Sequence, residues 1–449
     1  MAVSLSFGLY LLYLALAYLR PIEAFAPELV EYRPMLVLSL LTLAVSVGSA
    51  IVRRTVAARP QHLWLLLGFV AAIAMSHLSA GRFGIALDSF IDFMPSVVLF
   101  VTTVTNVTDL RRLRLTCAVV VVCTSLLGIA SIAAYHTGFL ADKLLLRESP
   151  ESSEQPSEPS EPATSPAEDV SGAYLWRVQS LGYLSDPNDF AQAIVVSLPL
   201  LAALLARTRP LRSLVGVGIP GATLLYTIYL THSRGALLGL GSLFLAGARR
   251  MVGIRWTAVL LVAGIGAAVA VGFTGGRAYT ANEESAGGRI DAWNAGLSML
   301  ASHPLFGVGY HFFTEYHALT AHNSFVLCAA ETGLVGYVLW LGMLVVVLKD
   351  LSVAIRAGGD PDAVRWANAL RASLVGFLTC ALFLSRAYEP LIYQTLGLCV
   401  SASYCATRAA QPGPARDPAR PTRWLGASLT VAFISIVAIR LFVFLMDAM

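Results

Sequence analysis

Long, continuous apolar runs constrain the fold of this 449-residue chain more than any other feature. The hydrocarbon core of a bilayer is about 30 Å thick, so a helix needs about 20 largely apolar residues to cross it. Only helices and closed barrels satisfy all backbone hydrogen bonds there, and runs that do not alternate predict helices. Thirteen runs approach this length, the first and eighth being short: 4–19, 34–52, 63–80, 86–105, 115–135, 186–206, 213–231, 235–248, 256–273, 323–348, 367–385, 390–407 and 424–445.

Composition supports an all-α polytopic membrane protein. The chain is 57% hydrophobic and 13% charged, whereas a soluble domain has about 25% charged residues. Its net charge of +4 is spread over short loops. A basic patch that would bind nucleic acid is therefore not predicted.

The basic residues orient the predicted helices, because Lys and Arg are enriched in cytoplasmic loops. Twenty of the 31 basic residues fall in alternate short loops, which we expect to be cytoplasmic. The two longest loops, 136–185 and 274–322, then lie on the opposite side, in the periplasm. This reading divides the chain into five segments: N-terminal transmembrane helices (1–135), a periplasmic loop (136–185), central transmembrane helices (186–273), a large periplasmic catalytic loop (274–322) and C-terminal transmembrane helices (323–449).

The sequence indicates neither a cleaved leader nor a metal site. The first apolar run lacks a basic region and a small-residue cleavage site, so a retained helix is expected. All six cysteines fall in predicted spans, where a periplasmic disulfide framework cannot form. His303, His311, His317 and His322 do not repeat at helical spacing, and no HExxH motif accompanies them. We therefore predict no metal and no cofactor.

The first long loop contains an acidic Glu/Ser/Pro tract over residues 148–171. Such a composition predicts a disordered insertion, or alternatively an acidic skirt facing a charged membrane surface. Arg147 precedes the tract, and Arg177 and Gln179 follow it. Cations on the outer side oppose the orienting rule, so we expect a functional reason for them and assign these three residues to substrate binding.

Two helix starts carry further candidates. Asp186-Pro187-Asn188 is typical of a helix N-terminus with Asp186 as its cap, and such an end also attracts anions. Arg234, in Ser233-Arg234-Gly235, lies at a predicted outer membrane boundary. It either snorkels to the interface or points into a cavity that holds an anion.

The second long loop carries the clearest chemistry. Arg289, Trp293 and Leu297 recur every four residues and therefore share one face of a helix, with Gly287-Gly288 expected as the turn before it. Arg289 could instead pair with Asp291, Glu283 or Glu284 in a purely structural role. A proline at 304 is expected to end this helix at His303.

His322 directly precedes the next span. It either caps the helix or forms a local hydrogen bond, or it transfers a proton, since histidine titrates near neutral pH. Gly307-Val308-Gly309, between the two parts of the predicted site, is unassigned, a lid over a lipid substrate being one interpretation.

The motifs occur in the order Asp186-Pro187-Asn188, Ser233-Arg234-Gly235, Gly288-Arg289 with Trp293, Gly307-Val308-Gly309, and His322-Asn323 with Glu331-Thr332-Gly333. This order resembles the O-antigen ligase and polymerase superfamily over about residues 180–340. The resemblance implies about twelve transmembrane helices, a helical periplasmic loop region and a glycosyltransferase C-like fold. Thirteen candidate spans depart from that even number, so a short one would be re-entrant or interfacial.

The resemblance also implies an activity. An O-antigen ligase in the bacterial inner membrane transfers O-antigen polysaccharide from undecaprenyl pyrophosphate to the lipid A core oligosaccharide on the periplasmic side. By the resemblance His322, Arg289 and Arg234 are catalytic, and Asn188, Trp293 and Asn323 join the substrate-binding group. The expected partners are the lipid-linked O-antigen, the lipid A core and membrane lipids. An O-antigen polymerase is the alternative, and a pilin oligosaccharyltransferase or a solute transporter fits less well.

Overall fold

The computed structural model describes residues 5–148, 165–166, 174–205, 210–247, 253, 284–409 and 422–447. The predicted span 256–273 lies outside these residues, as does most of the acidic tract. The chain divides into two compact units. The first contains residues 1–41, 114–277 and 375–377, and the second contains residues 42–113, 278–374 and 378–449.

The first unit is built mainly of helices. It contains, in chain order, α1 (Leu5–Leu19), α2 (Pro21–Phe25), η1 (Pro27–Tyr32), the start of α3 (Pro34–Arg53), most of α6 (Leu110–Thr137), α7 (Ala141–Leu144), strands β1 (Leu145–Glu148) and β2 (Leu175–Val178), η2 (Gly182–Leu184), α8 (Pro187–Leu205), α9 (Pro210–Thr231) and a helix over Arg234–Gly247.

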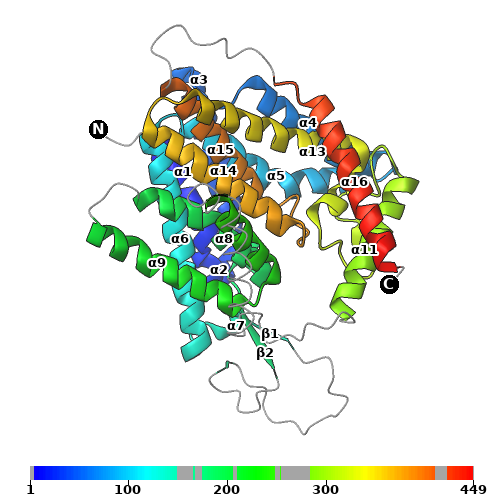
Figure 1. The fold of residues 1–449 in the computed structure, drawn as a ribbon, viewed down its shortest axis with the longest axis horizontal. Coiled ribbons are helices and arrows are strands. Elements are labelled where there is room, and N and C mark those ends of the chain that lie inside the picture. The colour runs from blue at the N-terminus through cyan, green and yellow to red at the C-terminus, as the bar shows by residue number, and fades with distance from the viewer. Residues whose placement is uncertain are drawn as a thin grey trace. The chain divides into compact units, whose positions relative to one another are not determined.

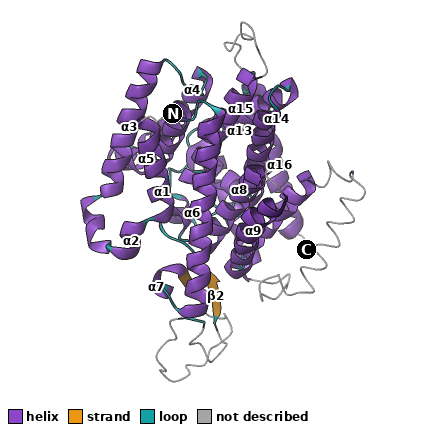
Figure 2. Ribbon diagram, turned by 90° about the vertical axis from the view of Figure 1, so that its left-hand side faces the viewer, coloured by secondary structure: helices purple, strands orange, loops and turns teal. Residues whose placement is uncertain are grey.

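An antiparallel pair of strands lies beyond one end of α6 (Figure 2). Leu146 of β1 pairs with Arg177 of β2. The hydroxyl of Ser131, on α6, donates a hydrogen bond to the carbonyl oxygen of Gln179 at 2.8 Å. Buried apolar side chains of α6, α7 and both strands form a small core around Trp176, which fixes the strands against the helix.

The second unit is helical throughout its described part. It contains the rest of α3 and α4 (Pro60–Leu78), α5 (Phe83–Asn106), α11 (Glu284–Ser302), α12 (Phe313–Tyr316), α13 (Ser324–Ala357), most of α14 (Pro361–Ala381), α15 (Pro390–Ala409) and α16 (Leu425–Asp447). Helices α11 and α16 lie side by side (Figure 1), where Arg440 donates a hydrogen bond to Asn294 Oδ1 at 2.9 Å.

Helix boundaries follow local sequence signals. Proline is the first residue of α3, α4, α8, α14 and α15, because its fixed φ suits the first helical turn and its missing N–H costs nothing there. Asp186 Oδ1 accepts a hydrogen bond from Asn188 N at 2.7 Å, as predicted for a cap. Helix α11 ends at Ser302, one residue before the predicted His303 end.

One local prediction is wrong. Gly287 and Gly288 lie inside α11, which already includes Glu284, so they do not form a turn before it. A Cβ on Gly288 would lie 2.9 Å from Leu319 Cδ1, so the lack of a side chain permits close packing against the loop before His322.

The helices support the prediction of a polytopic membrane protein. Every predicted span within the described residues falls on a helix. Seven described helices are long and apolar enough to cross a membrane, and Leu5–Leu19, Val215–Thr231 and Arg234–Gly247 are shorter apolar helices. The number of crossings, twelve or thirteen, stays a prediction. All six cysteines are free and buried.

Contacts within the second unit join helix ends at two places. Arg59 and His62 pair with Asp350, while Gln61 Nε2 donates to Thr422 O at 2.8 Å. These residues belong to ends predicted as cytoplasmic. At the other helix ends, Arg82 donates to Val308 O at 2.9 Å. Loops predicted on the same side therefore contact one another in this unit.

Candidate active site

The second unit contains Arg289, Trp293 and His322. Arg289 and Trp293 lie on α11, both half-buried. The Trp293 indole donates a hydrogen bond from Nε1 to the carbonyl oxygen of Ala321 at 2.9 Å. Ala321 is fully buried and directly precedes His322. The indole therefore connects the helix that carries Arg289 to the backbone that carries His322.

Helix α11 packs closely against the start of α13. A Cβ on Gly296 would lie 2.5 Å from Val326 Cγ1 and 3.0 Å from the Phe313 ring. Trp293 also packs against Phe442 of α16, with ring centroids 5.4 Å apart. Small and aromatic residues thus fix the position of α11 within this unit.

His322 occupies a strained position. Its φ is 46°, in the left-handed region that non-glycine residues rarely adopt. Asn323, not His322, caps α13: its Oδ1 accepts hydrogen bonds from Phe325 N at 2.9 Å and Val326 N at 3.2 Å. His322 is therefore not the cap of α13, whereas a local hydrogen bond of its side chain stays a prediction. The strain must be offset by surrounding contacts, a pattern that concentrates at functional sites.

The loop of His322 is also held by residues 384–386. Ser324 Oγ donates to Leu384 O at 2.6 Å and accepts a hydrogen bond from Arg386 N at 2.8 Å. Thr320 donates to Ser385 Oγ at 2.9 Å. Hydrogen bonds on both sides of His322 therefore fix its backbone.

Helix α13 is broken at Gly333, whose φ is 63° and ψ −170°. The free backbone groups at the break bond to residues 304–309. Val308 N donates to Ala330 O at 3.0 Å and Gly309 N to Glu331 O at 3.1 Å. On the other side of the break, Leu334 N donates to Pro304 O at 2.8 Å. These hydrogen bonds satisfy backbone N–H and C=O groups of α13 that would otherwise be unpaired inside a membrane.

Glycines allow the two backbones to approach closely enough for these hydrogen bonds. A Cβ on Gly307 would lie 2.4 Å from the backbone of Glu331, and a Cβ on Gly333 would lie 2.4 Å from the backbone of Leu305. Both glycines also have positive φ. The segment 304–309 is therefore fixed to α13, which disfavours its interpretation as a lid. It anchors the short half-helix that begins next to His322.

Glu331 is 1% exposed and lies two residues before the break. Its Oε1 accepts a hydrogen bond from Phe313 N at 3.1 Å. The Tyr388 hydroxyl lies close enough to this carboxylate to feel its charge. Burial, and then the negative charge of Glu331, raise the pKa of Tyr388 well above its ordinary value. Tyr388 therefore stays protonated opposite Glu331.

The first unit contains Arg147, Arg177, Gln179, Asn188 and Arg234. Arg177, only 5% exposed, donates from Nε to Thr231 O at 2.8 Å and from NH2 to Asn188 Oδ1 at 3.0 Å. Burial lowers its pKa, and nearby Asp186 opposes the shift. Arg177 thus brings together β2, the end of α9 and the start of α8.

The other outer-side cations of this unit have structural contacts. Lys143 Nζ donates to Ala24 O at 2.7 Å, and Gln179 Nε2 to Lys143 O at 3.2 Å. Arg147 is exposed and lies over the Tyr174 ring, 4.6 Å from its centroid. These contacts give a structural reason for cations that the orienting rule does not explain.

Arg234 is the first residue of the helix over Arg234–Gly247 and is half-buried. Its neighbour His232 has a φ of 50°. Burial lowers the pKa of His232, and the charge of Arg177 lowers it further. The positive end of the helix dipole repels the Arg234 guanidinium. An anion placed there would be stabilised by the dipole and by Arg234 together.

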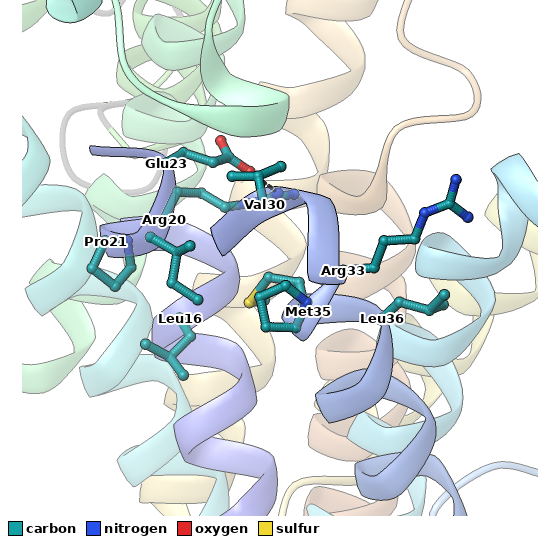
Figure 3. A pocket seen from close by; sticks show the side chains of 10 residues that line it. Leu16, Arg20, Pro21, Glu23, Val30, Arg33, Met35 and Leu36 are labelled. Carbon is teal, nitrogen blue, oxygen red and sulfur yellow. Dashed lines mark hydrogen bonds and ion pairs between the residues drawn. The ribbon is translucent and has the colours of Figure 1, made fainter. Parts of the chain in front are cut away.

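An apolar pocket of about 200 Å³ lies in the first unit, between the end of α1 and the start of α3. Leu16, Pro21, Arg33 and Met35 are among the residues that line it (Figure 3). No predicted site residue is part of its lining.

The structure thus brings Arg289, Trp293, His322 and Asn323 together in one unit, and Arg177, Gln179 and Asn188 together in the other. The sequence analysis did not find Asp92, Tyr310, Arg386 or Tyr388 as neighbours of this region. Only Asp92 gave a signal, as a carboxylate inside a predicted apolar span.

The helices and the polar groups at their ends define a polytopic α-helical membrane protein. Residues 219–341 match the family model described as O-antigen ligase. This match makes residues 219–341 similar to the O-antigen ligase family. No curated protein matches the chain. The matched residues include Arg234, Arg289 and His322 but not Arg147, Arg177, Gln179 or Asn188.

Proposed function

We propose that this protein is an O-antigen ligase of the bacterial inner membrane. It transfers O-antigen polysaccharide from undecaprenyl pyrophosphate to the lipid A core oligosaccharide, at a site on the periplasmic side. The observation that carries the proposal is the family match, which includes Arg234, Arg289 and His322. The fixed backbone of His322 supports a catalytic role for this residue.

The reaction has two requirements. A hydroxyl of the acceptor sugar forms a bond to the anomeric carbon of the donor while the bond from that carbon to the pyrophosphate oxygen breaks. The hydroxyl loses a proton, which neutral His322 accepts at a ring nitrogen. The electron pair leaves with the lipid pyrophosphate, whose charge Arg289 and Arg234 neutralise. Direct attack inverts the anomeric configuration.

Arginine suits this role without a metal. A guanidinium group presents paired N–H donors that match two phosphate oxygens and stays charged at all relevant pH values. Arg177 and Arg147 are assigned a lesser part. Arg177 positions Asn188 and the end of α9, next to His232 and Arg234 in the chain, so it acts on the donor site through these neighbours.

A polymerase would use the same donor with a second lipid-linked glycan as its acceptor, and it is the main alternative. A transporter would also have broken membrane helices, and α13 has such a break at Gly333. Its backbone groups, however, are bonded to residues 304–309, which close the break instead of opening a path.

The test is deletion of the gene in its host, followed by complementation. We expect deletion to remove the lipopolysaccharide ladder on gels while long lipid-linked O-antigen accumulates. Wild-type protein should restore the ladder. His322→Ala should not restore it although the protein is inserted at normal levels, whereas His303→Ala, at an exposed position, should. Accumulation of single repeat units would identify a polymerase. Near-normal ladders with His322→Ala would exclude His322 as the general base.

A further inference from the structure

Asp88 and Asp92 are exposed carboxylates in the apolar helix α5, and of the two Asp92 contacts residues of the loop after 304–309. It lies on α5, one of the helices able to cross a membrane, and its side chain is 61% exposed. A carboxylate inside a membrane is costly unless it faces water, a partner or a ligand. Asp92 is therefore expected to face water or a polar ligand.

Two residues of the loop after 304–309 contact Asp92. The Tyr310 hydroxyl donates a hydrogen bond to Asp92 Oδ2 at 3.2 Å, and His311 Nδ1 lies 3.8 Å from the same oxygen. The His311 ring stacks on Tyr310, with centroids 4.1 Å apart and planes inclined by 14°. Tyr310 is buried, whereas the His311 side chain is 59% exposed. The imidazole is thus a flat, exposed platform with a carboxylate beside it.

Tyr310 itself is held firmly. Its backbone N donates to Ser76 Oγ at 3.0 Å, and its carbonyl oxygen bonds to His77 Nε2 at 3.0 Å. His311 has a φ of 59°, a left-handed conformation that is strained for histidine. The platform therefore has a fixed position.

Residues 386–389 complete the cluster. The buried ring of Tyr388 lies 4.7 Å from that of Tyr310 and 5.8 Å from that of His311, centroid to centroid. Arg386 NH1 lies 3.7 Å from Glu389 Oε1, and the backbone N of Arg386 bonds to Ser324, two residues after His322.

The charges of this cluster disfavour an anionic ligand. Asp92 and Glu389 are acidic, and Arg386 is already paired with Glu389. Partial desolvation by neighbouring groups and the charge of Arg386 lower the pKa of His311, although Asp92 opposes the shift, so His311 adds little positive charge at neutral pH. Among the described residues, no three His, Cys, Asp or Glu side chains are grouped so as to hold a metal ion. The cluster instead offers carboxylate acceptors and an aromatic face, which suit the hydroxyls and the C–H face of an uncharged sugar.

We propose that Asp92 and His311 form a binding subsite for a sugar residue of the acceptor glycan, with Asp92 accepting hydrogen bonds from sugar hydroxyls and His311 supporting the ring. This proposal rests on the proposed function. It separates the recognition of the acceptor from the arginines that bind the pyrophosphate.

The test uses full-length protein in liposomes, a lipid pyrophosphate-linked oligosaccharide as donor and lipopolysaccharide that ends at the core as acceptor. Asp92→Asn and His311→Gln are each expected to raise the KM for the acceptor about tenfold, since each loses a hydrogen bond to a charged group or a ring contact. The KM for the donor and the kcat at saturating acceptor should not change. Asp88→Asn is the matched control, because Asp88 is exposed one helical turn earlier on α5.

Free core oligosaccharide, without lipid A, gives a second measurement. It should inhibit transfer by wild-type protein and by Asp88→Asn, and should inhibit Asp92→Asn about tenfold less well. An unchanged acceptor KM in both variants, or a fall in kcat alone, would overturn the subsite. Wild-type protein that transfers no glycan to the core lipid would instead contradict the proposed function.

Discussion

The indole Nε1 of Trp293 donates a hydrogen bond to the carbonyl oxygen of Ala321 at 2.9 Å, across 28 positions of the chain. Ala321 is fully buried, so this carbonyl has no access to water. A single side-chain donor therefore connects α11 with the strained backbone at His322.

Trp293→Phe should slow transfer without unfolding the protein. Phenylalanine keeps the ring but leaves the Ala321 carbonyl unpaired, which costs about 1–3 kcal/mol. If half of that loss falls on the position of His322, the rate falls about two- to tenfold. The measurement is the initial rate of transfer at equal amounts of inserted protein. Trp64→Phe, at an exposed position of α4, serves as the control, and equal rates for both variants would contradict the role of this bond.

Arg289→Lys should lower kcat/KM about 100-fold, because lysine keeps the charge but cannot form paired hydrogen bonds to phosphate. Arg356→Lys, at an exposed position near the end of α13, should have no effect. Steady-state kinetics with varied donor checks this. An unaffected rate for Arg289→Lys would indicate that Arg289 belongs to a structural ion pair.

Transfer should continue at an unchanged rate after treatment with EDTA. Guanidinium groups neutralise the leaving pyrophosphate in the proposed mechanism, so no divalent cation is needed. The comparison is the transfer rate before and after chelation, with and without added Mg²⁺ or Mn²⁺. Complete loss that either ion restores would contradict the arginine clamp.

Gly307→Ala should destabilise the protein by more than about 2 kcal/mol. The new Cβ would lie 2.4 Å from the Glu331 backbone, and φ at this position is 70°. Thermal unfolding in detergent should show a clearly lower Tm. Gly84→Ala is the control, because nothing lies within 4 Å of its Cβ. A Tm for Gly307→Ala equal to that of the control would show that the segment 304–309 does not support the break in α13.

His232 should make the protein less stable in acid. Burial, and then Arg177, lower its pKa below the ordinary 6.5. Between the folded pKa and 6.5 the unfolded chain binds a proton that the folded chain does not, so stability falls as pH decreases through this window. The Tm of His232→Gln should therefore fall less than the Tm of the wild type between neutral and mildly acidic pH. If the Tm of both proteins fell equally with decreasing pH, the lowered pKa of His232 would be contradicted.

Local sequence signals predicted the helices well. Twenty-residue apolar runs, prolines at first helical turns and the Asp186 cap all act within a few neighbouring residues, so their effect can be read from the chain. The Gly287-Gly288 turn failed because glycine can also serve close packing inside a helix, and Leu319 supplies that contact from 31 positions away.

The sequence by itself determined the class of protein, the places of its helices along the chain and the residues that carry the motifs, because apolar length and capping are local properties. Only the tertiary structure decided that residues 304–309 bond to the broken α13, that Asn323 caps α13 in place of His322, and that Asp92 meets Tyr310 and His311. These contacts join segments far apart in the chain. Periodicity shows which face of a helix is apolar, but packing between helices decides which side chains meet.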